Sequence, residues 1–198
     1  MTDKNKRNKQ AKLLRLSRKI HRTLGAFLFI FFFVIAVTGV MLGWKSHSGG
    51  LILAKTPKGS STDLKDWLSI DSLHKIACKS LHKAVSNELS LKLNRIDIRK
   101  DKGIVKFIFD NHYWGVHLDG ATGKLLQIES RRSDFIENIH DGSILDFYLD
   151  TSSDQIKLTY TSIMGVALLG FTVTGFWLWY GPKRMRKTSS KKSDGITN

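Results

Sequence analysis

Residues 19–50 read KIHRTLGAFLFIFFFVIAVTGVMLGWKSHSGG, and residues 23–44 within this stretch contain no charged side chain. A helix needs about 20 apolar residues to cross the hydrocarbon layer of a membrane, so this segment is long enough to span one. A histidine lies at each border of the stretch, His21 and His47. A cleaved signal peptide is the alternative, but its apolar region usually covers only about 7–15 residues. The pattern therefore predicts a membrane anchor.

Residues 158–182 form a second stretch without charge that is also long enough to span. The formal net charge of the 198-residue chain is +15, and the two ends carry most of it. Residues 1–22 hold nine Lys or Arg against one acidic residue, and residues 183–198 hold six against one. Because basic segments beside membrane spans stay in the cytoplasm, the sequence predicts a hairpin with both termini cytoplasmic and residues 45–157 outside.

The region between the two spans has the pattern of a small α+β domain. Residues 45–62 are rich in small and helix-breaking residues, which predicts a linker. Ser69 is a candidate N-cap for an amphipathic helix over residues 70–84. Four alternating segments joined by short turns follow, which predicts an antiparallel meander with the helix on its apolar face. These segments are LKLNRIDIRK (91–100), IVKFIFD (104–110), HYWGVHL (112–118) and KLLQIES (124–130).

The predicted helix, the meander and VHLDGATGKLLQIES (116–130) together resemble a PepSY domain. The surrounding segments resemble the PepSY-associated transmembrane helix family: residues 19–44, IHDGSILD (139–146) and GFTVTGFWLWYGPKRMRK (170–187). The resemblance covers residues 18–187, although larger members of the family have four or more spans and this chain has two. It implies an α+β membrane protein of the bacterial cytoplasmic (inner) membrane, in which a two-helix transmembrane hairpin encloses a periplasmic PepSY domain.

The predicted organisation follows from these segments. It consists of a basic cytoplasmic tail (1–22), a transmembrane helix (23–44), a linker (45–62), the PepSY domain (63–132), an outer connector (133–157), a second transmembrane helix (158–181) and a second basic tail (182–198).

The tripeptide Val-Thr-Gly occurs once in each predicted span, at residues 37–39 and 173–175. In one interpretation the threonine bonds back to its own helix and the glycine allows close packing. In the other, the glycine leaves room for a flat cofactor against the helix. Gly39 and Gly43 also form a G-x-x-x-G pair, which fits packing against the second span or a homodimer through the first span.

Three of the seven histidines, His21, His47 and His140, fall at the predicted membrane borders. Imidazole is a common ligand of haem iron, and low-spin haem takes two axial ligands. The resemblance implies haem b, which some four-span relatives bind. We therefore predict that His47 and His140 form an outer pair of ligands. His21 has no second inner histidine and would need a second chain. The alternative is that all three are interfacial residues without a ligand.

The other histidines are not predicted to form a site. His74, Cys78 and His82 recur at four-residue intervals, but they drift around the predicted helix and no carboxylate joins them. Cys78, the only cysteine, excludes an intrachain disulfide. His112 and His117 are predicted on opposite faces of one strand, exposed or in cross-strand pairs.

Three functions are compatible with these features. The resemblance implies a haem protein that transfers electrons in the reduction of iron–siderophore complexes; as an enzyme it would be a component of a membrane-bound reductase. A periplasmic PepSY module that inhibits or chaperones a peptidase is the second, and an accessory subunit of a larger membrane complex is the third. No catalytic residue and no metal site beyond haem is predicted. Lipid, a second copy or a larger complex are the expected partners, and the basic tails lack the interleaved aromatic residues of a nucleic-acid interface.

Overall fold

The computed structural model describes residues 3–149, 151 and 154–193. The chain divides into two compact units, one formed by Met1–Ile35 with Gln155–Asn198 and the other by Ala36–Asp154. The ends of the two predicted tails, residues 1–2 and 194–198, and connector residues 150 and 152–153 lie outside the described residues.

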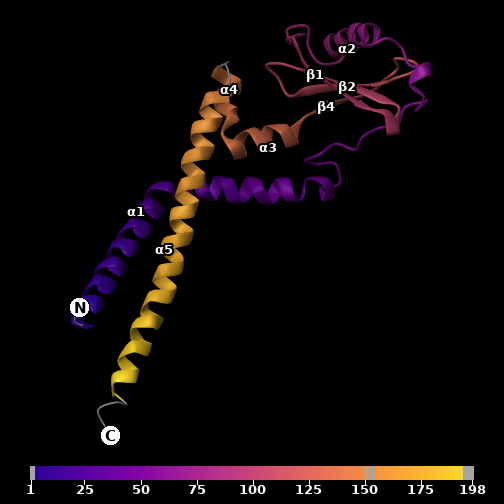
Figure 1. The fold of residues 1–198 in the computed structure, drawn as a ribbon. Helices are drawn as coiled ribbons and strands as arrows, with labels where there is room; N and C mark the ends of the chain where they lie inside the picture. The colour runs from indigo at the N-terminus through magenta and orange to yellow at the C-terminus, as the bar shows by residue number, and fades with distance from the viewer. Residues whose placement is uncertain (1–2, 150, 152–153, 194–198) are drawn as a thin grey trace. The chain divides into compact units, whose positions relative to one another are not determined.

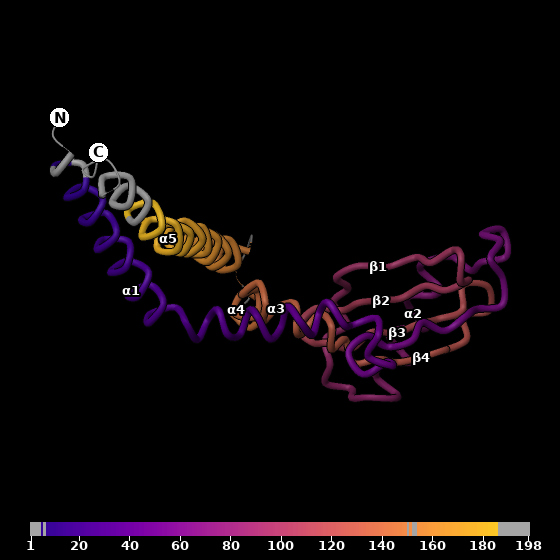
Figure 2. Tube along the Cα trace, turned by 90° about the horizontal axis from the view of Figure 1, so that it is seen from below, coloured from indigo at the N-terminus to yellow at the C-terminus, as the bar shows by residue number. Residues whose placement is uncertain are grey.

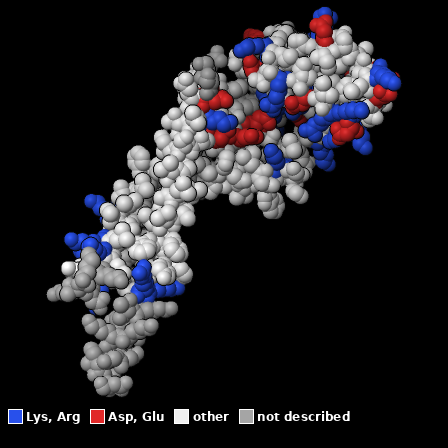
Figure 3. Space-filling model, viewed as in Figure 1, with Lys and Arg blue, Asp and Glu red and all other residues white. Residues whose placement is uncertain are grey.

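The first unit consists of two long helices, α1 (Asp3–Gly43, whose last turns belong to the second unit) and α5 (Gln155–Ser193). Leu28 of α1 packs with Met164 and Ala167 of α5. Both helices are long and apolar enough to cross a membrane, over Arg7–Gly43 and Gln155–Met185. Most of their apolar side chains point outward, as with Phe27, which is 77% exposed. In Figure 3 the middle of the helices is accordingly white, without charged side chains.

The second unit is built around a four-stranded antiparallel sheet in the order β1-β2-β3-β4, which Figure 2 shows side by side. The strands are β1 (Leu93–Arg99), β2 (Ile104–Phe109), β3 (Trp114–Asp119) and β4 (Leu125–Ser130). This strand order confirms the predicted antiparallel meander. The prediction was possible because the alternation of apolar and polar residues fixes which face of each strand is buried.

Helix α2 (Ile70–Ala84) lies against one face of this sheet, as Figure 1 shows. The hydroxyl of Ser69 accepts a hydrogen bond from the backbone N–H of Ser72, so the predicted N-cap is confirmed. Leu73, Ala77 and Leu81 of α2 are fully buried. They form a core with apolar residues of the strands, among them Val105, Phe107, Phe109, Val116 and Leu118.

The turn between β3 and β4 is held by Asp119. Its Oδ1 accepts hydrogen bonds from the backbone N–H groups of Ala121 and Thr122, and its Oδ2 accepts one from the N–H of Ser60. Gly123 has a φ of 70°, in the left-handed region that favours glycine. A Cβ atom at Gly123 would lie 2.7 Å from Cδ1 of Ile76 on α2. The turn between β3 and β4 therefore packs against α2, the helix that covers the sheet.

Two short helices occupy the connector that follows the sheet, α3 (Arg132–Asp141) and α4 (Ser143–Leu149). Gly142, at a φ of 81°, ends α3 in a left-handed C-cap. No helix was predicted in this connector. Its helices matter for function because α3 carries His140 in its last turn.

Candidate functional site

His21, in α1, contacts the Val-Thr-Gly tripeptide of α5. Its Nδ1 atom lies 2.9 Å from Oγ1 of Thr174, and its Cε1 atom lies 3.7 Å from the position of a Cβ at Gly175. The ring also meets Phe171 edge-on, with centroids 4.9 Å apart. The pairing arises because α1 and α5 pack against each other in this unit, as at Leu28, Met164 and Ala167, which places His21 beside Thr174.

His140, in α3, contacts the Val-Thr-Gly tripeptide of α1 in the same way. Its Nδ1 atom lies 2.9 Å from Oγ1 of Thr38. Its Cε1 atom lies 3.4 Å from the position of a Cβ at Gly39, whereas Gly43 on the same helix has no atom within 4 Å of such a position. The helix surface at Gly39 is therefore in contact with the His140 imidazole, whereas the surface at Gly43 contacts no other described residue.

The two contacts repeat one arrangement in two different units of the chain. In each, a threonine oxygen meets Nδ1 of a half-buried histidine and the next residue, a glycine, lies beside the ring. The Thr174 hydroxyl donates to the carbonyl of Gly170 at 2.6 Å, which confirms for this threonine the interpretation that it bonds back to its own helix. The surface beside each glycine is in contact with an imidazole of the chain itself, and the interpretation of a flat cofactor there stays a prediction. The repeated tripeptide was a signal in the sequence, but its histidine partners were not predicted.

His47 is placed differently. It lies in a short 3₁₀ helix, Lys45–His47, and is exposed. Among the described residues its side chain forms no hydrogen bond, ion pair or ring contact, with His140 or with any other residue. The structure therefore brings His140 to Thr38 and Gly39 and leaves His47 free in the same unit.

The donor atoms at His21 and His140 fit an axial ligand of haem. In each ring one nitrogen is engaged by threonine, while Nε2 has no hydrogen-bond partner among the described residues. Within that part of the chain no group of three or more His, Cys, Asp or Glu side chains is placed to hold a metal ion, so a single imidazole is what each site offers. This is the donor that haem iron accepts, because the porphyrin supplies the other ligands.

A pocket of about 430 Å³ lies in the helix unit. Its volume is in the range of small-molecule sites. Its lining residues are Leu13, Ser17, Thr172, Val173, Phe176 and Trp177. Neither His21 nor the residues that contact it, Phe171, Thr174 and Gly175, belong to this lining, so the pocket is separate from the His21 contact.

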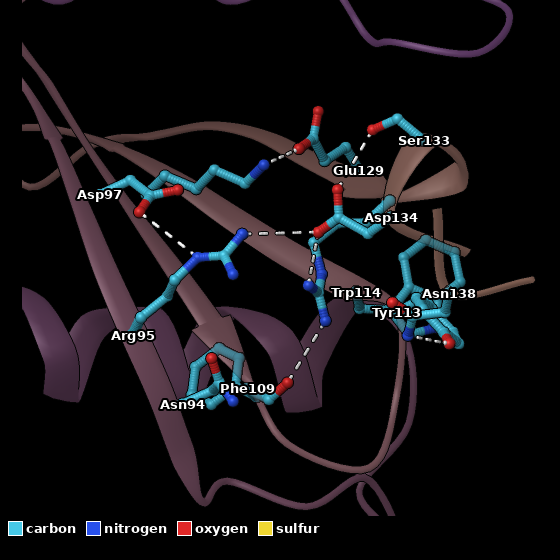
Figure 4. A network of polar contacts seen from close by, with 12 residues as sticks. Asn94, Arg95, Asp97, Phe109, Tyr113, Trp114, Glu129, Ser133, Asp134 and Asn138 are labelled. Carbon is cyan, nitrogen blue, oxygen red and sulfur yellow. Dashed lines mark hydrogen bonds and ion pairs between the residues drawn. The ribbon is translucent and has the colours of Figure 1, made fainter. Parts of the chain in front are cut away.

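A separate polar cluster lies on the sheet face opposite α2. Glu129 of β4 contacts Nζ of Lys106 at 2.5 Å and Nε2 of His117 at 3.2 Å, and the three side chains are 5–15% exposed. Burial raises the pKa of Glu129, but the contacts with His117 and Lys106 outweigh it and lower the pKa to about 2. Figure 4 shows Glu129 near Asp134, which contacts Arg95. Asp134 also forms an ion pair with Arg131 at 2.8 Å.

The other histidines have structural surroundings. Nε2 of His74 lies 3.4 Å from Sγ of Cys78, and its ring stacks on Phe107. Nε2 of His82 meets the carbonyl oxygen of Leu89 at 3.1 Å. His112 precedes β3 instead of lying in it and is buried, and His117 is buried in the cluster described above. The prediction for His112 was wrong because its ring fills a space beside Phe109.

Comparison of the sequence with protein-family models and with curated proteins finds no match. The resemblance to the PepSY-associated family consequently stays a prediction, and the site has to be judged on its own geometry.

Proposed function

We propose that this chain is a PepSY-associated haem protein of the bacterial cytoplasmic membrane, in which His21 and His140 are axial ligands of haem b. The single observation that carries the proposal is the repeated contact: two histidines, each with Nδ1 at 2.9 Å from a threonine hydroxyl and with no hydrogen-bond partner for Nε2 among the described residues. Metal-bound histidines characteristically have their second ring nitrogen engaged in this way. Chance surface histidines have no reason to share one arrangement.

The membrane arrangement belongs to the same proposal. Two helices long and apolar enough to span, with basic residues at both ends of the chain, support a hairpin with cytoplasmic termini. His21 then serves a haem near the cytoplasmic face and His140 one near the periplasmic face. Each low-spin haem needs a second ligand. His47 is the candidate for the outer site, and a second copy of the chain, meeting along the first span, supplies the inner one.

Haem, when bound, supplies one-electron chemistry at its iron. The chain's part would be to hold the ring in an apolar setting, and the exposed apolar side chains of α1 and α5 support that role. Electron transfer to iron–siderophore complexes is the reaction that we propose. A periplasmic binding module is the alternative class, and it predicts a protein without haem.

An absorption spectrum of the full-length protein in detergent, oxidised and then reduced with dithionite, tests the proposal. We expect a reduced haem b spectrum in the wild type. His21→Ala should remove one haem per dimer and His140→Ala one haem per chain, because each removes an iron ligand. His82→Ala is the control, since that imidazole contacts only a backbone carbonyl.

A wild type without haem, or full haem content in both ligand variants, would contradict the haem function. The binding module would then be the better reading of the sheet unit. Removal of haem by His140→Ala but not by His47→Ala would retain the outer site and exclude His47 as its second ligand.

A further inference from the structure

We infer that Thr174 and Thr38 are positioning residues: each accepts the Nδ1 proton of its histidine and thereby keeps Nε2 deprotonated. That Nε2 binds a haem iron rests on the proposed function. The position of the proton does not, because it follows from the hydrogen bonds of the chain itself.

The proton on His21 can be assigned from the bonds of Thr174. The Thr174 hydroxyl has one proton, and its Oγ1 atom lies 2.6 Å from the carbonyl oxygen of Gly170. A carbonyl oxygen only accepts, so the hydroxyl proton lies in that bond. The 2.9 Å contact between Oγ1 and Nδ1 must then use a proton on the imidazole. A neutral ring carries one proton, so Nε2 keeps its lone pair.

The orientation of the ring is fixed by two further contacts. The His21 ring lies against α5, with Cε1 3.7 Å from where a Cβ at Gly175 would be, which is an ordinary van der Waals distance. Phe171, one turn earlier on α5, meets the same ring at an interplanar angle of 84°. Thr174, Gly175 and Phe171 thus surround the ring, and among the described residues Nε2 makes no hydrogen bond.

We extend the assignment to His140 by analogy. Thr38 and Gly39 repeat the tripeptide, and the Oγ1–Nδ1 distance is again 2.9 Å. Cε1 of His140 lies 3.4 Å from the position of a Cβ at Gly39, compared with 3.7 Å for His21 and Gly175. Two sites with the same proton placement offer the same donor atom, so they would bind the same class of ligand.

Nitrogen NMR of the ligand-free protein in detergent, labelled with ¹⁵N in its histidine rings, tests the proton placement. The wild type should show Nδ1 protonated and Nε2 bare for both histidines. Thr174→Val should shift the His21 tautomer toward Nε2–H, and Thr174→Ser should preserve the wild-type signal. Thr38→Val and Thr38→Ser should act in the same way on His140. Each substitution serves as a control for the other histidine, because the two sites lie in different units.

Thr172→Val is the matched control within α5. Its hydroxyl also bonds back to the carbonyl four residues earlier, Leu168, at 2.9 Å, but it contacts no histidine. It removes the same kind of helix contact as Thr174→Val and should leave both histidine signals unchanged. Protonated Nε2 in the wild type, or one tautomer in wild type and Thr174→Val alike, would overturn the inference.

Haem binding adds a second readout. Loss of a hydrogen bond to a ligating histidine costs about 10–100-fold in metal affinity. Thr174→Val should therefore weaken haem binding by about that factor and change the reduction potential of the remaining haem, and Thr174→Ser should restore both. Correct tautomers in a protein without haem would end the proposed function but not the inference. Haem bound with equal affinity and potential in Thr174→Val would end the inference but not the function.

Discussion

Glu129 shows how a single buried acid ties two strands together. Its carboxylate forms ion-pair contacts with Lys106 of β2 and His117 of β3, and its side chain is only 7% exposed. Burial alone would keep this carboxyl protonated, and the two basic partners reverse that preference. Removal of one partner of such a buried group typically costs about 3–5 kcal/mol, because the remaining charge is left uncompensated.

This residue makes the sheet unit sensitive to acid. The folded pKa of Glu129, about 2, lies below the ordinary value of 4.5. Its ionised form therefore contributes stability that is complete above pH 4.5 and is lost as the pH falls toward 2, on the order of 3 kcal/mol. Denaturant titrations in detergent between pH 6 and pH 2 should show this loss in the wild type and not in Glu129→Gln. Glu88→Gln, at an exposed turn position, should retain the wild-type profile.

Single residues were also the hardest to place from the sequence. His117 alternates with apolar neighbours and was expected in an exposed or cross-strand position, and it does lie opposite Lys106 across the strands. That its ring is buried depends on what covers this face of the sheet, which local alternation does not encode. The cluster around Glu129 was not predicted for the same reason.

Strands and helix α2 could be predicted to within a few residues. Their periodicity, the N-cap at Ser69 and the turn at Gly123 are local signals, and local signals fix local structure. Helices α3 and α4 were missed because they are short and carry no strong apolar period. The pairing of His140 with Thr38 depends on α3, so it could not be found without the structure, whereas the repeated tripeptide pointed to Thr38 and Thr174.

The β3–β4 turn allows a prediction at the scale of the element. Gly123→Ala should lower the free energy of unfolding by about 1–2 kcal/mol or more, because a Cβ meets a left-handed backbone and Cδ1 of Ile76 at 2.7 Å. Denaturant titration measures it, and haem content should be unchanged.

Gly49→Ala separates the two causes of that loss. Gly49 has a similar φ of 65°, but no atom lies within 4 Å of a Cβ there. Gly49→Ala should therefore lose only the part of the free energy of unfolding that comes from the left-handed backbone conformation. An equal loss in both variants would show that contact with α2 adds nothing at the turn.

At the scale of the whole molecule, the proposed topology can be tested with thiol probes. Cys78 is half-buried, and burial raises the pKa of its thiol, so it is a poor target at neutral pH. Exposed positions in a Cys78→Ser background are better: Lys83→Cys on α2 and Lys9→Cys on α1. An impermeant maleimide should label Lys83→Cys in intact spheroplasts and Lys9→Cys only after the membrane is permeabilised. Labelling of Lys9→Cys from outside would contradict cytoplasmic termini.

The separation of the paired residues along the chain has a consequence for biosynthesis. Thr38 and His140 are 102 residues apart, and His21 and Thr174 are 153 apart. A ribosome that has reached residue 157 has therefore made both halves of the first pair but only one half of the second. The His21 contact can close only after residue 174, within α5, has been made, so it forms later in synthesis than the contact between Thr38 and His140. Acquisition of a ligand at His21 would then mark a chain whose synthesis has passed residue 174.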